Sequence, residues 1–125
     1  MAEHELTSTN FEATLAASDT LIIDFWAPWC GPCRAFGPIF AKAAETHPEI
    51  TFGKCNTEDQ PDLAGMFGIR SIPTLAVFRE QVLVFMQPGM LPAEALEELI
   101  GKIKALDMAK VHAEVEKQSE KAVNA

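Results

Sequence analysis

The chain of 125 residues is long enough for one domain with its own hydrophobic core. Hydrophobic residues make up 48% of it and charged residues 22%, a balance that excludes a disordered chain. Its net charge of −8 and the lack of a basic cluster argue against nucleic acid and anionic membranes as partners.

The spacing of apolar and turn-forming residues predicts helices alternating with strands. In chain order we expect a helix over 11–17, a strand over 21–26, a helix from the 30–33 turn to about 46, a strand over 51–55, a short helix over 63–67, strands over 75–78 and 82–85 paired as a hairpin, and a helix from 92. Thr9 and Glu12 match a capping box for the first helix. Pro38 should kink the second helix, because proline removes a backbone hydrogen bond. This order predicts an α/β domain with three layers and a central mixed sheet.

The C-terminal segment is predicted to be an extension that lies outside this domain. We divide the chain into a domain at 1–106 and a helical or partly disordered extension at 107–125. The apolar residues of the extension fall on one helix face, namely Met108, Val111, Val115 and Ala122. That face is rotated by roughly a quarter turn from the apolar stripe of the preceding helix, so one straight helix could not press both onto the domain. The extension therefore bends or projects; we expect a monomer, with a weak dimer through this helix as the alternative.

A C-x-x-C motif, Cys30-Gly31-Pro32-Cys33, follows the first predicted strand. Two cysteines at this spacing, on a strand-to-helix turn, can close a small disulfide and reopen it. The turn should expose Cys30, while the following helix aims unpaired backbone N–H groups at its sulfur and favours the thiolate. The motif predicts a redox site.

The alternative for a C-x-x-C pair is half of a zinc site, which normally needs four ligands. The other candidate ligands are Cys55, His4, His47 and His112, and they form no second pair with such spacing. We therefore expect neither zinc nor an iron–sulfur cluster. Three cysteines cannot form a disulfide framework, and the segment 1–5 lacks the basic start and apolar core of a secretory signal, so we expect a cytoplasmic protein without a membrane span.

Several segments together resemble the thioredoxin family, in its order and with its spacings. They are Asp-Phe-Trp-Ala-Pro-Trp-Cys-Gly-Pro-Cys at 24–33, Pro38, Lys54, Gly-Ile-Arg-Ser-Ile-Pro-Thr at 68–74, and Gly89. The resemblance covers roughly residues 10–103. It implies the thioredoxin fold, thiol–disulfide exchange with protein disulfides, and no bound cofactor beyond the Cys30–Cys33 disulfide. The implied partner is thioredoxin reductase, a flavoprotein that recharges the disulfide with NADPH.

The resemblance also implies roles for single residues. Cys30 would attack a substrate disulfide, and Cys33 would resolve the mixed disulfide. Asp24 lies in an apolar run that should raise its pKa, and it would accept the proton of Cys33, with Lys54 near its carboxylate. The Gly31-Pro32 dipeptide accompanies reductants in this family, so we expect substrates to be reduced.

An exposed apolar groove around Cys30 is expected to bind substrate. By resemblance its residues are Trp29, Gly31, Pro32, Ile72, Pro73 and Gly89, with a cis Ile72–Pro73 bond. Trp26 should support the core, and Cys55 should be a buried, inert thiol.

Three features depart from the family pattern and leave other functions open. Ser71 and Pro88 stand where glycine and a branched apolar residue are more common, and the hairpin turn Arg79-Glu80-Gln81 lacks an Asn-Gly pair. With the extension, these departures suit a dedicated reductant for one partner protein. A further alternative is an interaction or chaperone-like module that uses the groove without turnover. The intact cysteine pair with Asp24 favours chemistry.

Overall fold

The computed structural model describes residues 2–124, with side chains described as far as residue 120; the predicted stripe residue Ala122 lies outside that range. The elements are β1 (Glu3–Glu5), α1 (Phe11–Ala17), β2 (Thr20–Trp26), α2 (Gly31–Thr46), β3 (Thr51–Asn56), α3 (Pro61–Met66), β4 (Thr74–Arg79), β5 (Val82–Pro88), α4 (Ala93–Lys104) and α5 (Met108–Asn124). Every predicted helix and strand is present within a few residues. The strand β1 was not predicted.

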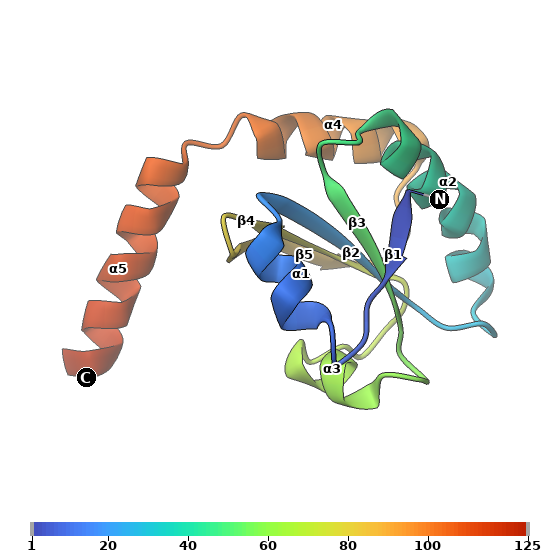
Figure 1. The fold of residues 1–125 in the computed structure, drawn as a ribbon, viewed down its shortest axis with the longest axis horizontal. Helices are drawn as coiled ribbons and strands as arrows, with labels where there is room; N and C mark the ends of the chain where they lie inside the picture. The colour runs from blue at the N-terminus through green and yellow to red at the C-terminus, as the bar shows by residue number, and fades with distance from the viewer. Residues whose placement is uncertain (1, 125) are drawn as a thin grey trace.

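The five strands form one mixed sheet in the order β1-β3-β2-β4-β5 (Figure 1). β1 and β2 both pair with β3 in parallel, whereas β2–β4 and β4–β5 are antiparallel. The sheet thus has two parallel pairings in its first half and an antiparallel hairpin at the other edge. The expected three-layer α/β fold with a mixed sheet is confirmed.

Two hydrophobic cores lie on opposite faces of the sheet. On one face Ile22 packs with Phe36 and Phe40 of α2 and Ile100 of α4. On the other face Ile23, the next residue of β2, packs with side chains of α1 and α3. Because side chains alternate along a strand, neighbouring residues of β2 serve different cores. Asp24 therefore projects toward the α2 face.

The residues of β1 do not predict a strand, because Glu-His-Glu is charged and has low strand propensity. Its position is fixed by the next residue, Leu6, which is fully buried and whose N–H donates to the carbonyl of Lys54 at 2.8 Å. Gly53 permits this close approach, since a Cβ there would lie 2.5 Å from Leu6 Cδ1. Backbone pairing and one leucine anchor thus outweigh the poor local propensity.

The capping box predicted for α1 is wrong. The helix begins after Asn10, whose side chain caps no helical N–H. Instead Asn10 Oδ1 accepts from the Thr7 N–H at 2.8 Å, and Thr7 Oγ1 accepts from the Asn10 N–H at 3.2 Å. This reciprocal pair stabilises the loop before the helix, so Thr9 and Glu12 are not needed for it.

The β4–β5 hairpin turns at Glu80 and Gln81, which have positive φ angles of 49° and 68°. Two left-handed central residues are the conformation that suits the twist of a two-residue hairpin. Neither residue is Asn or Gly, which explains why the turn could not be predicted from its sequence. The Glu80 N–H donates to the Asp19 carbonyl at 2.7 Å and fastens the turn to the loop before β2.

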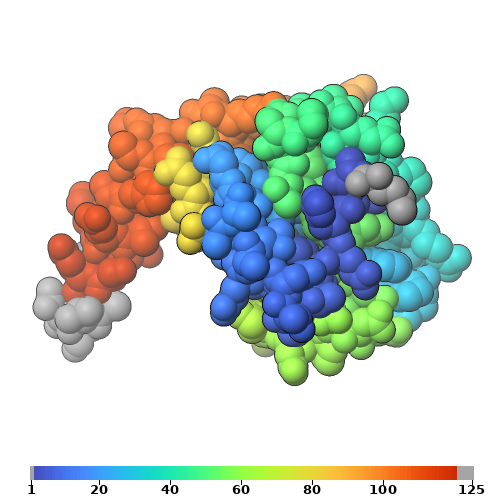
Figure 2. Space-filling model, in the orientation of Figure 1, coloured from blue at the N-terminus to red at the C-terminus, as the bar shows by residue number. Residues whose placement is uncertain are grey.

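The extension is a separate helix that projects from the domain, as Figures 1 and 2 show. The chain leaves helical conformation between Lys104 and Met108, so the two apolar stripes need not share one surface. Met108 is buried, whereas Val115 is 42% exposed. Arg79 Nη1 donates to the carbonyl oxygens of Ile103, Lys104 and Leu106, at 2.7, 3.2 and 3.2 Å, and so holds the end of α4 against β4. Over residues 2–124, no helix is long and apolar enough to cross a membrane.

Candidate active site

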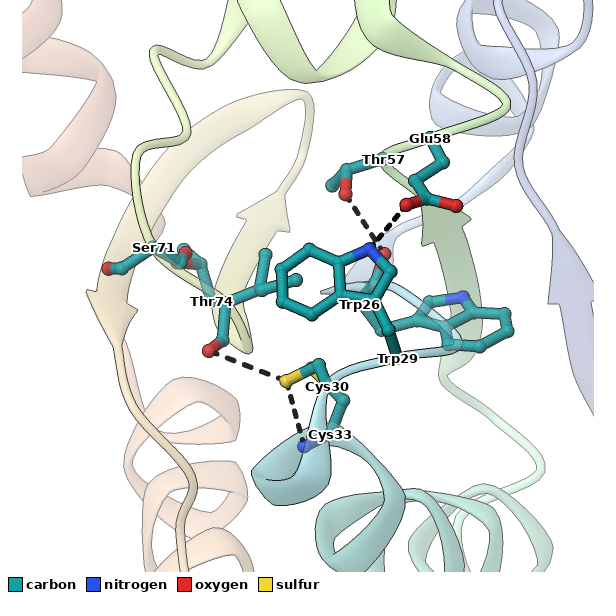
Figure 3. Close-up of a disulfide and its surroundings, with 9 residues drawn as sticks. Trp26, Trp29, Cys30, Cys33, Thr57, Glu58, Ser71 and Thr74 are labelled. Atoms are coloured by element: carbon teal, nitrogen blue, oxygen red, sulfur yellow. Dashed lines mark hydrogen bonds between the residues drawn. A yellow bond between two sulfur atoms is a disulfide. The ribbon is translucent and has the colours of Figure 1, made fainter.

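The predicted cysteine pair lies where β2 leads into α2, and the two residues form a disulfide with Cα atoms 5.2 Å apart (Figure 3). Cys30 is the N-cap of α2, and its Sγ accepts a hydrogen bond from the Cys33 N–H at 3.2 Å. An N-terminal N–H of a helix favours negative charge on the atom that it contacts. Once the disulfide is reduced, this contact favours a thiolate on Cys30 rather than on Cys33.

The expected exposure of Cys30 is wrong for the oxidised protein. Its exposed fraction is 4%, and that of Cys33 is 3%. The loop before β4 accounts for this, because the Ile72 carbonyl oxygen lies 3.7 Å from Cys30 Sγ and the adjacent Pro73 is buried. In the oxidised protein the first sulfur is therefore covered by this loop rather than exposed on a bare turn.

The surface next to the disulfide carries the predicted aromatic residue. Trp29 is 64% exposed, and Gly31 and Pro32 are exposed beside it. The indole Nε1–H of Trp29 donates to a carboxylate oxygen of Glu58, in the loop after β3 (Figure 3). Sequence reasoning missed Glu58, since only the fold brings this loop to the 29–33 turn.

The remaining predicted groove residues lie just before β4 and just after β5, and a hydrogen bond joins the two segments. The Ile72–Pro73 peptide bond is cis, as expected, and the Gly89 N–H donates to the Pro73 carbonyl at 2.8 Å. Gly89 has a φ of 99°, a conformation in which a side chain would be strained. Pro88 pairs with Thr74 at the outer edge of the sheet, where a missing N–H costs no ladder bond.

Asp24 and Lys54 are exact register partners in the parallel β2–β3 pairing. Asp24 is fully buried, and neither carboxylate oxygen has a hydrogen-bond partner among the described residues. Burial raises the pKa of Asp24 from 3.8 to about 7, with Lys54 acting in the opposite direction and Glu3 in the same direction. The Lys54 ammonium lies 4.7 Å from the ring centroid of Trp26, which is half-buried. The expected upward shift of this pKa is confirmed.

Cys55 is a free thiol on the opposite face of the sheet, in the core with Phe25 and Leu63. Burial, and secondarily the charge of Asp24, raise its pKa to about 11. It is therefore protonated at neutral pH and a poor nucleophile. Among residues 2–124, no group of three or more His, Cys, Asp or Glu side chains could hold a metal ion.

Comparison with known proteins assigns the chain to a family. The sequence model of the thioredoxin family matches residues 2–104. This chain belongs to the thioredoxin family. A Streptomyces coelicolor protein named "Putative thioredoxin 2" is 53% identical over 118 residues, which cover 94% of this chain and 88% of that protein. The thioredoxin of Alicyclobacillus acidocaldarius is 37% identical, over 78% of this chain and 94% of its own length.

Solved structures agree with this assignment. The oxidised form of mitochondrial thioredoxin 3 from Saccharomyces cerevisiae matches with a TM-score of 0.74 and 31% identity, covering 81% of this chain and 95% of that one. The present chain is accordingly a thioredoxin-type protein-disulfide oxidoreductase, and Cys30 and Cys33 form its redox-active pair. In such a protein the cysteine pair itself carries the electrons, so the chemistry needs no bound cofactor.

Proposed function

We propose that this thioredoxin reduces protein disulfides, with Cys30 as the attacking nucleophile. The observation that carries the proposal is the Cys33 N–H directed at Cys30 Sγ, which supports a thiolate on the first cysteine only. The Cys30 thiolate attacks one substrate sulfur, forms a mixed disulfide and releases the other substrate sulfur as a thiolate. The Cys33 thiolate then attacks Cys30 Sγ, which re-forms the Cys30–Cys33 disulfide and releases the second substrate thiolate.

Asp24 is proposed as the proton acceptor that makes Cys33 a thiolate. A carboxyl group with a pKa near 7 can both accept and release a proton at neutral pH, which a carboxylate of ordinary pKa does poorly. Asp24 projects from β2 toward α2, the helix that carries Cys33. Lys54 opposite it limits the rise in the pKa of Asp24 and is proposed to keep the group titrating near neutrality.

Substrate is proposed to bind on the surface around the disulfide. Trp29, Gly31 and Pro32 offer an exposed, largely apolar patch on one side, and Ile72, Pro73 and Gly89 close the other side. An extended segment next to Cys30 could pair with backbone groups of the Ile72–Pro73 loop. Disulfide-containing proteins are therefore the proposed substrates.

The proposed electron source is an NADPH-dependent flavoprotein, thioredoxin reductase, which returns two electrons to the Cys30–Cys33 disulfide. The cytoplasm is the proposed location. The free Cys55 thiol supports this location, because a reducing compartment keeps unpaired thiols reduced. The division into a domain at 1–106 and an extension at 107–125 is likewise a proposal, supported by the break in helical conformation before Met108.

The test is insulin disulfide reduction with NADPH and a thioredoxin reductase. Cys30→Ser and Cys33→Ser should both be inactive, whereas the matched control Cys55→Ser should retain near-normal turnover. Cys33→Ser should also accumulate a mixed disulfide with substrate through Cys30, and Cys30→Ser should accumulate none. Stable trapping by Cys30→Ser would reverse the assignment of the two cysteines. Wild-type protein that binds insulin without reducing it would instead support an interaction module.

A further inference from the structure

The edge strand β1 places acidic side chains next to the buried Asp24–Lys54 pair. In the sheet order β1-β3-β2, Lys54 lies on the strand between Asp24 and the acids of β1. Glu5 is the register partner of Lys54, and Glu3 is the partner of Phe52, two residues along β3. Because side chains alternate along strands, Glu3, Glu5, Lys54 and Asp24 all belong to the α2 face of the sheet.

A cavity of about 290 Å³ lies between these strands on that face. Its lining residues are Glu3, His4, Glu5, Trp26, Lys54 and Asn56. Oε1 of Glu3 is buried and has no hydrogen-bond partner among the described residues. Because no group of the described residues neutralises this carboxylate, its charge acts on the ionisable side chains that share the cavity.

The charges around Asp24 do not balance. Among the residues with described side chains, Lys54 is the cation whose charge lowers the pKa of Asp24, and Glu3 is the anion whose charge raises it. Within residues 2–124, Lys54 forms no ion pair within 4.0 Å. Its ammonium group is therefore in direct contact with neither the Asp24 nor the Glu3 carboxylate. The other titratable groups near the pair are the Cys33 thiol on α2, the Cys55 thiol on β3, and His4 and Glu5 on β1.

We propose that Glu3 is a positioning residue for proton transfer: its carboxylate competes with Asp24 for the Lys54 ammonium and sets the pH at which Asp24 takes the Cys33 proton. One ammonium cannot neutralise two carboxylates in a site of low dielectric. The surplus negative charge favours a proton on the more deeply buried group, which is Asp24. The effect of Glu3 on the pKa of Asp24, upward and opposed to that of Lys54, agrees with this. The kinetic part rests on the function proposed above.

The expected size follows from the sheet geometry. β1 and β2 are separated by two strand spacings, about 10 Å, and Glu3 is offset from the register of Asp24 by two residues, so the two backbones lie roughly 12 Å apart. At that distance, with a protein dielectric of about 20 and screening by physiological salt, a charge shifts its neighbour's titration by roughly 0.2 to 0.3 pH unit. Removal of the Glu3 charge should therefore move the midpoint of Asp24 downward by about that amount.

The test follows the NMR chemical shift of the Asp24 carboxyl carbon over pH 4–10 in wild type, Glu3→Gln and Glu5→Gln, and takes the midpoint of each titration curve. Glu5→Gln is the matched control, because it removes the same charge from the same strand and the same cavity but at an exposed side chain. We expect a downward midpoint shift of roughly 0.2 to 0.3 unit in Glu3→Gln and a wild-type midpoint in Glu3→Asp. Glu5 is closer to Asp24 by register, but its carboxylate is exposed and screened by water, so we expect a smaller shift in Glu5→Gln. Equal shifts in Glu3→Gln and Glu5→Gln, or none in either, would overturn the proposal.

A second measurement separates this inference from the proposed function. The pH profile of mixed-disulfide resolution should shift with the NMR midpoint in Glu3→Gln, whereas a purely structural role of Glu3 would scale the rate at every pH equally. If the NMR midpoint moves and the rate profile does not, Glu3 sets the charge on Asp24 but Asp24 is not the proton acceptor. A rate profile that shifts with a constant NMR midpoint would refute the route through Asp24.

Discussion

Replacement of the buried acid, Asp24→Asn, should stabilise the protein at neutral and alkaline pH. In the folded chain the pKa of Asp24 is raised to about 7 by burial, whereas in the unfolded chain it returns to its usual 3.8. Between these values the unfolded chain loses its proton first, so wild-type stability falls as pH rises from about 4 to about 7 and stays reduced above that. Asparagine cannot ionise and does not incur this loss.

The magnitude follows from the pKa shift. Each unit corresponds to about 1.4 kcal/mol, so the shift of roughly three units predicts about 4 kcal/mol in favour of Asp24→Asn at pH 8. Near pH 4 the difference in the free energy of unfolding should shrink to within about 1 kcal/mol. In the folded state Asp24 is then a neutral carboxyl group and the asparagine a neutral amide, and both lack hydrogen-bond partners.

Urea unfolding of both proteins, oxidised, at pH 4, 6 and 8 measures this difference as a function of pH. The same variant should slow the resolution of a mixed disulfide, since Cys33 loses its proton acceptor. If the variant folds normally and is no more stable than wild type at pH 8, or if the difference is the same at all three pH values, burial does not raise the pKa of Asp24.

Two further predictions concern the turn and the extension. Gln81→Gly should raise stability by about 1 kcal/mol in urea unfolding, because Gln81 has a φ of 68° and glycine adopts that conformation without strain; a loss of stability would show that the Gln81 side chain matters more than its backbone. A chain that ends at Leu106 should keep insulin reduction within about twofold. Its free energy of unfolding should fall by about 1–2 kcal/mol, because the buried Met108 is removed while the three carbonyl groups that Arg79 contacts remain. Failure of that chain to fold would make α5 part of the domain, and a change in sedimentation alone would identify it as a contact between copies.

Much of the fold could be read from the sequence because the signals are local. The apolar runs at β2 and β4 predict buried strands, and the Cys-Gly-Pro-Cys segment predicts a redox turn before a helix. Asp24 is unusual for the same local reason, since burial of an acid in an apolar strand disfavours its charged form and raises its pKa. These conclusions needed only the residues and their neighbours along the chain.

The features that the sequence left undetermined depend on residues far apart in the chain. β1 is a strand only because Leu6 fits over Gly53 and its backbone pairs with β3. Cys30 is covered because the Ile72 carbonyl, 42 residues later, lies against its sulfur. The proposed role of Glu3 cannot be inferred from its charged N-terminal segment, because only the sheet brings it into the cavity that it shares with Lys54. Local patterns decide which segments are strands and helices, whereas burial, charge balance and access at the site are set by which of those segments become neighbours in space.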